Sequence, residues 1–147
     1  MKNRIFLICT AFLGIFSSCS TDDENTDTQK PNIYLNSPSD EQIFEPGDTI
    51  MVDAEFTDNQ ALGSYKIEIH FAGDGHHHKT EEEGVEWFYT ETGMIAGTPK
   101  VYHLVKEISI PTAINGEPLE HGHYHLGIYL IDAAGNEKQE FIEIEIH

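Results

Sequence analysis

The chain has 147 residues, of which 26 are acidic and 8 are basic, so its formal net charge at pH 7 is −18. Binding to a nucleic-acid backbone needs a basic surface, so this charge excludes nucleic acid as a partner. It also argues against attraction of the folded domain to an anionic membrane surface.

The first 18 residues have the pattern of a secretory signal peptide. A basic start precedes an apolar run over residues 5–16, and two serines lie directly before Cys19. The apolar run is too short for a permanent transmembrane helix. The small residues before the cysteine resemble a bacterial lipobox, which implies that Cys19 is lipidated and becomes the first residue of the mature chain. An ordinary signal peptide cleaved near residue 18 is the alternative.

Residues 19–30 form a polar, acidic segment directly after the cysteine. Low hydrophobicity and clustered charge predict a disordered tether. An acidic run at this place also resembles the export signal of surface-exposed lipoproteins in Bacteroidetes, although a solvated linker explains it equally well. The resemblance implies a protein of the cell outer membrane that is exposed at the surface and contacts the membrane only through its lipid anchor.

Residues 31–147 are predicted to fold as one all-β domain. Short segments alternate between apolar and polar residues, and no segment has the 3.6-residue period of an amphipathic helix. About seven strands separated by turn signals indicate an immunoglobulin-like antiparallel β-sandwich. The predicted strands cover residues 33–35, 49–57, 62–71, 101–110, 121–131 and 140–146, with a further short strand near residues 85–89.

The segment over residues 121–131 carries both a fold signal and a chemical signal. Its residues at even positions are apolar, and histidine occupies three odd positions. Residues two apart share a face of a strand, so one face suits a core and the other carries a row of imidazoles. The apolar set is Tyr124, Leu126, Ile128 and Leu130, and the polar set is His121, His123 and His125.

Several short motifs in the chain resemble bacterial immunoglobulin-like modules. Gly122-x-Tyr124 is similar to the tyrosine corner of these domains, and the turns at 58–62 and 132–136 are similar to theirs. Together with the segment 64–70 and the histidines, they make residues 31–147 resemble an uncharacterised family of putative Bacteroidetes lipoproteins with an immunoglobulin-like domain and a histidine-rich segment. The resemblance implies the fold and the location more firmly than it implies an activity.

The immunoglobulin-like arrangement would bring three groups of histidines to one end of the sandwich. Strands 62–71 and 121–131 would be antiparallel neighbours, so the end of the first, at His70, would lie beside the start of the second, at His121 and His123. The 73–80 loop would leave from the same end. Imidazoles that converge on one face suit Zn²⁺ or Cu²⁺. The candidate ligands are His70, His76, His78, His121, His123 and His125. Histidines that only decorate a polar surface, or that respond to pH, are the alternatives.

The opposite end of the sandwich should gather four polar turn residues: Asp58, Asn59, Asp132 and Asn136. Oxygen ligands of this kind suit Ca²⁺. Turn chemistry explains all four residues without an ion, so we do not expect calcium there.

The neighbouring aromatic residues Trp87, Phe88 and Tyr89 suggest a second class of function, a platform for a sugar. Core packing of Trp87 and Tyr89 is the alternative, and exposure of the rings distinguishes the two. No enzyme is expected, because Gly-x-Ser-x-Gly, P-loop and His-Glu-x-x-His motifs do not occur.

The sequence therefore predicts a lipid-anchored domain of the cell envelope that binds zinc or copper through its histidines. The expected partners are the metal ion and an outer-membrane transporter. A glycan-binding, adhesion or structural module that binds no metal is the alternative function.

Overall fold

The computed structural model describes residues 26–73 and 84–147, and the described residues form strands and connections without a helix. Seven strands are long: β1 (Asn32–Ser37), β3 (Thr49–Thr57), β4 (Leu62–Phe71), β5 (Phe88–Met94), β6 (Val101–Ser109), β9 (Gly122–Asp132) and β10 (Glu137–Ile146). Three are short: β2 (Gln42–Phe44), β7 (Ala113–Ile114) and β8 (Glu117–Pro118).

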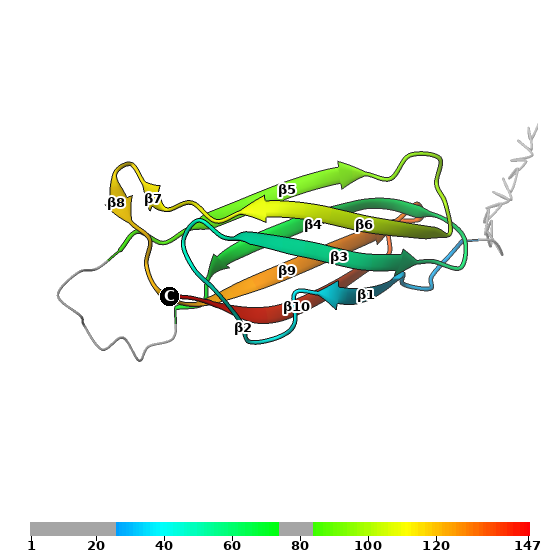
Figure 1. Cartoon of the computed structure of the whole chain (residues 1–147). Coiled ribbons are helices and arrows are strands. Elements are labelled where there is room, and N and C mark those ends of the chain that lie inside the picture. Colours follow the sequence, from blue (N-terminus) through cyan, green and yellow to red (C-terminus); the bar gives the residue numbers. More distant parts are fainter. Residues whose placement is uncertain (1–25, 74–83) are drawn as a thin grey trace, which may run out of the picture.

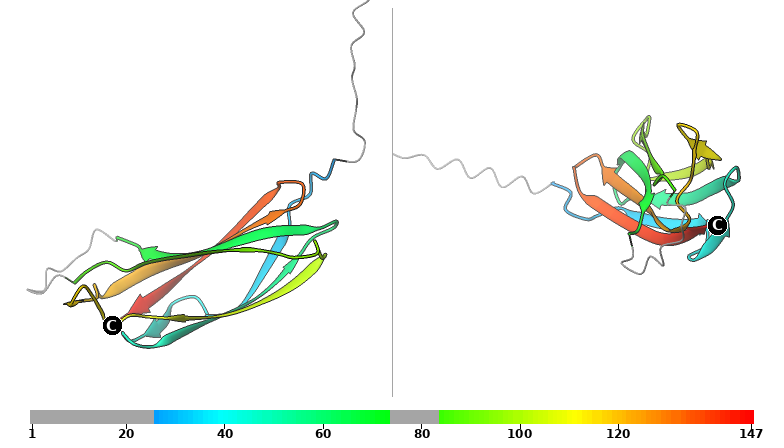
Figure 2. Two further views of the ribbon diagram at one scale, coloured as in Figure 1. Left: turned by 90° about the horizontal axis from the view of Figure 1, so that it is seen from above. Right: turned by 90° about the vertical axis from the view of Figure 1, so that its left-hand side faces the viewer.

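These strands form the two layers of a sandwich (Figure 1; Figure 2, right). One sheet has the order β1-β3-β6 and the other has the order β2-β10-β9-β4-β5, while β7 and β8 form a separate hairpin. The seven long strands pair antiparallel, which confirms the predicted immunoglobulin-like sandwich.

The short strands were not predicted, because two or three residues are too few to show an alternating pattern. One of them, β2, pairs with β10 in the parallel sense. The predicted extra strand also begins later than expected, at Phe88. Before it, Val85 makes only an isolated bridge with Leu119.

The core lies between the two sheets and follows the predicted alternation. The four even-numbered apolar residues of β9, Tyr124 to Leu130, are fully buried. The β3 residues that face them from the other sheet are fully buried as well. Full burial of one large aliphatic side chain contributes about 1.5–3 kcal/mol, so this alternation fixes which face of each strand meets solvent. The buried β3 residues are Ile50, Val52, Ala54 and Phe56.

The antiparallel register of β4 and β9 defines the two ends of the sandwich. Leu62 pairs with Asp132 at one end, and His70 pairs with His125 near the other. The register shifts between Leu62 and Ser64, at Gly63. A Cβ atom on Gly63 would lie 2.8 Å from the carbonyl oxygen of Asp132, so the close approach of the two backbones requires glycine.

The predicted tyrosine corner is present at the start of β9. The buried Tyr124 hydroxyl donates a hydrogen bond to the carbonyl oxygen of Glu120 at 2.7 Å. The backbone N–H of Trp87 donates to the same hydroxyl at 3.5 Å. The hydroxyl thus fixes the chain that enters β9 against the segment before β5.

No helix within residues 26–73 and 84–147 is long and apolar enough to cross a membrane. The predicted signal peptide and Cys19 lie outside the described residues, as do His76 and His78.

Replacing Tyr124 with phenylalanine tests the corner. We expect Tyr124→Phe to lower the free energy of unfolding by about 1–2 kcal/mol, because it leaves the Glu120 carbonyl without its buried donor. Urea denaturation should show a lower midpoint at an unchanged slope. The exposed Tyr34 provides a matched control, since Tyr34→Phe should leave the midpoint unchanged. Equal midpoints for the two variants would show that the corner does not stabilise the fold.

Candidate functional site

The histidine end of the sandwich is built around two imidazoles on neighbouring strands. His70 on β4 and His125 on β9 are register partners, and their rings meet edge to face with centroids 5.4 Å apart. Both belong to the outer face of the five-stranded sheet, because their sequence neighbours Ile69 and Leu126 point into the core. The sequence placed His121 and His123 beside His70, whereas the structure places His125 there.

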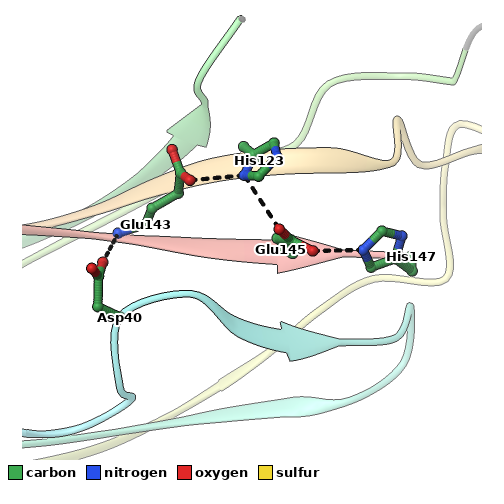
Figure 3. Close-up of polar contacts among 5 residues, drawn as sticks. All are labelled: Asp40, His123, Glu143, Glu145 and His147. Carbon is green, nitrogen blue, oxygen red and sulfur yellow. Dashed lines mark hydrogen bonds and ion pairs between the residues drawn. The ribbon is translucent and has the colours of Figure 1, made fainter. Parts of the chain in front are cut away.

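His123 lies further toward the start of β9 on the same outer face. Its Nδ1 atom is 2.8 Å from Oε1 of Glu143 and 3.6 Å from Oε1 of Glu145 (Figure 3). The second oxygen of Glu145 lies 2.8 Å from Nε2 of His147. The Nδ1 atom of His123 is buried and lacks the alignment of a hydrogen bond, so its contact with Glu143 is an ion pair when the imidazole is protonated.

Glu68 is the carboxylate that lies beside the ring of His70, as Glu143 lies beside that of His123. Its Oε1 atom lies 3.4 Å from Nδ1 of His70, and its Oε2 atom accepts a hydrogen bond from Lys66 at 2.8 Å. That hydrogen bond raises the pKa of Lys66. A carboxylate beside Nδ1 orients an imidazole and favours a proton on that nitrogen, which leaves Nε2 as the atom that can bind a metal.

The described histidines do not form a preassembled site with three ligands. His121 is exposed and precedes β9. Within residues 26–73 and 84–147, one group of three potential ligand atoms from His, Cys, Asp or Glu lies within 4.8 Å, and it contains no histidine. His70 and His125 therefore form a pair, and His123 would reach a metal bound there only after a change of rotamer.

His103 lies outside this cluster, on β6. Its Nε2 atom is 2.9 Å from Oδ1 of Asp53 on β3, and the Asn36 side chain donates to the same oxygen at 2.9 Å. The hydrogen bond from Asn36, followed by the one from His103, lowers the pKa of Asp53. This histidine therefore has a structural partner on the three-stranded sheet.

The lowered pKa of Asp53 predicts a pH-dependent contribution to stability. In the unfolded chain the Asp53 carboxyl has a pKa of about 3.9, and in the folded chain its pKa is lower. The ionised carboxylate therefore contributes its full stabilisation of the folded state above the unfolded pKa, and this stabilisation is lost as the pH falls through the folded pKa. We expect the unfolding free energies of wild type and Asp53→Asn to converge as the pH falls from 6 to 2. Urea denaturation at each pH measures this difference, and a difference that stays constant across the range would contradict the assignment.

The aromatic segment before and within β5 is divided between core and surface. Trp87 is 6% exposed, and its ring centroid lies 6.3 Å from that of Tyr124. Trp87 and Tyr89 are tilted by 46° to one another, whereas Phe88 is 60% exposed and points to the other side. Core packing of Trp87 is thus confirmed, and the three rings do not form a coplanar platform for a sugar.

The opposite end of the sandwich gathers the four predicted turn residues. Oδ2 of Asp58 accepts hydrogen bonds from the backbone N–H groups of Gln60 and Ala61, both at 2.7 Å. Oδ1 of Asp132 accepts from the backbone N–H groups of Ala134 at 2.9 Å and Asn136 at 2.8 Å. Both carboxylates therefore organise their own turns, as turn chemistry predicts.

Asp27 is a further member of this polar end that the sequence pattern did not predict. Its Oδ1 atom accepts a hydrogen bond from the Asn59 side chain at 3.1 Å, and its backbone oxygen accepts from the Asn136 side chain at 3.1 Å. Asp27 belongs to the segment interpreted as a tether. One aspartate among many polar residues gave no signal that it would contact the folded domain.

The fold and its two polar ends define an immunoglobulin-like β-sandwich domain. The chain belongs to the family described as Domain of unknown function (DUF4625), whose model matches residues 17–147. No match was found among curated protein sequences.

Two crystal structures of OgpA from Akkermansia muciniphila are similar to the chain. The wild-type structure has a TM-score of 0.51 and 15% sequence identity, with 81% of this chain and 30% of OgpA covered. The catalytically inactive protein in complex with an O-glycopeptide (glycodrosocin) substrate also has a TM-score of 0.51 and 15% identity, with 86% and 32% covered. The chain thus spans about a third of OgpA, and at this identity the similarity shows a shared fold alone.

Proposed function

We propose that this chain is a lipid-anchored domain of the cell envelope that binds one Zn²⁺ or Cu²⁺ ion through its histidines. The ion would be held by Nε2 of His70 and His125, with His123 as the third ligand. His121 and the loop residues His76 and His78 are further candidate ligands. The role would be capture, storage or sensing of the metal rather than catalysis.

The observation that carries this proposal is the position of His70 directly opposite His125 in the β4–β9 ladder. Directly opposed residues on one sheet face have Cβ atoms about 4.5–5.5 Å apart, which is close enough for two imidazoles to share an ion. The rigid core beneath the two strands keeps the two positions together. A single exposed His-x-His pair on one strand would lack this support.

The surrounding charges favour a cation at the same place. Glu68 lies beside His70 and Glu143 lies beside His123, so carboxylates are available to orient both rings. The net charge of −18 raises the local concentration of cations around the whole molecule. Imidazole nitrogen favours zinc and copper over calcium and magnesium.

The location follows from sequence features rather than from the fold. The lipobox resemblance at Cys19 and the acidic run after it support a lipoprotein of the outer membrane, exposed at the surface, as in Bacteroidetes. A neighbouring outer-membrane transporter would be a suitable partner for a metal-binding domain at that site.

Metal titration of tag-free protein tests the proposal. We expect calorimetry to show one Zn²⁺ or Cu²⁺ ion bound with a Kd below about 1 μM. His70→Ala and His125→Ala should each weaken binding by about tenfold or more, because each removes a ligand from the ion.

His103→Ala is the matched control, because His103 is also a strand imidazole paired with a carboxylate. It should bind the metal as wild type does. Weak binding of several ions that is equal in all four proteins would contradict the proposal. The alternative of a glycan-binding, adhesion or structural module would then be the better account.

A further inference from the structure

We propose that Asp27, Asp58 and Asp132 hold one calcium ion at the end of the sandwich opposite the histidines, where the sequence alone gave no reason to expect an ion. Nothing in the family or in the structural similarities assigns a site there. The three residues come from separate segments: the chain before β1, the β3–β4 turn and the β9–β10 turn. Figure 1 shows these segments side by side at the end of the sandwich where the blue N-terminal segment enters.

The spacing of the three carboxylates fits a shared ion. One oxygen from each lies within 4.8 Å of the other two. Two oxygens bound to the same calcium ion at about 2.4 Å can be separated by at most about 4.8 Å. An ion in the middle of the group can therefore reach all three with small side-chain adjustments.

The buried Oδ1 atom of Asp58 is the independent observation that points to a ligand. Asp58 is 9% exposed, and its Oδ1 atom has no hydrogen-bond partner among the described residues. The backbone N–H groups of the β3–β4 turn donate their hydrogen bonds to the other oxygen, Oδ2. A buried carboxylate oxygen without a donor is costly, and nearly all such atoms in folded proteins have a partner. A cation at this place would supply the missing interaction.

The local charge leads to the same conclusion. Asp132 is 4% exposed, so two of the three carboxylates are withdrawn from water. Every ion pair found within the described part of the chain involves other acidic residues. Buried charges are normally paired or coordinate a metal. Three carboxylates that converge without a basic side chain therefore call for a bound cation.

The site also has room for an ion and its water. A hollow of about 280 Å³ lies beside the group, lined by Thr26, Asp27, Gln60, Ala61, Ala133 and Ala134. It supplies an entry path and space for water molecules to complete the coordination.

The donor chemistry selects calcium. All available ligands are oxygens, which disfavours zinc and copper. Asp27 is half-buried, and Oδ1 and Oδ2 of Asp132 each accept hydrogen bonds from their own turn. An ion bound there would have irregular coordination geometry, and water molecules would occupy several of its coordination positions. Calcium accepts six to eight oxygens in flexible geometry, whereas magnesium demands a near-ideal octahedron.

The ion would connect the segment before β1 to the two turns. Without an ion, Asp27 is joined to the two turns by hydrogen bonds from the side chains of Asn59 and Asn136, and its Oδ1 atom also accepts a local hydrogen bond from the backbone N–H of Gln29. Binding to the folded state alone raises the thermal midpoint with calcium concentration. Calcium would thereby fix the direction in which the chain enters the sandwich.

Calorimetry with CaCl₂ on tag-free protein stripped with a chelator tests this site. We expect one saturable calcium site, a rise in thermal midpoint on adding calcium, and little effect of MgCl₂ at the same concentration. Asp27→Asn and Asp58→Asn should each weaken binding by about tenfold or more. Asp27 lies outside every strand, so we expect Asp27→Asn to fold. This variant therefore tests calcium binding even if Asp58→Asn does not fold.

Asp48→Asn is the matched control. Asp48 also accepts a backbone hydrogen bond within a turn, from the N–H of Glu45, and its replacement removes the same charge. It should bind calcium as wild type does, and so should His70→Ala, which separates this site from the histidine site. No saturable binding, or equal binding by wild type and Asp27→Asn, would overturn the inference.

Discussion

The antiparallel register of β4 and β9 determines which residues meet at each end of the sandwich. It places Leu62 beside Asp132 and His70 beside His125, with the core residues Ile67 and Ile128 paired between them. A slip of one residue would turn every core side chain of one strand toward solvent, so burial holds the register firmly. At the acidic end, the close approach of the Gly63 backbone to the carbonyl oxygen of Asp132 fixes the same register.

One strand pair thus carries two chemically different ends. Imidazoles and glutamates line the outer face at the start of β9, and aspartates gather in the turns beyond its other end. Nitrogen-rich and oxygen-only donor sets favour different metals, so the two proposed sites would select different ions. The rigid sheet between them would keep the two ions apart, so that no residue of one site could bind the ion of the other.

Much of this arrangement could be predicted from the sequence, because the alternation of apolar and polar residues along a strand shows which side chains are buried. The parity of β9 follows from the local pattern, whereas the tyrosine corner at Tyr124 and the meeting of Asp58 with Asp132 follow from the resemblance to immunoglobulin-like domains. The residue directly opposite His70 could not be predicted, because alternation fixes the face on which a residue lies but not the register between two strands, and the shift at Gly63 changes that register by one residue. Asp27 was missed for a different reason: its contacts are long-range hydrogen bonds from Asn59 and Asn136, and such bonds have no sequence period.

The two proposed sites can be tested together by recording amide ¹H–¹⁵N spectra of one sample titrated first with calcium and then with zinc. We expect calcium to shift the amides of residues 58–61 and 132–136, and zinc then to shift those of 68–72 and 123–126 without reversing the first set. Shifts from both ions at the same residues would show that the two ends do not bind separate ions. Small shifts spread over the whole acidic surface would show that neither end is a defined site.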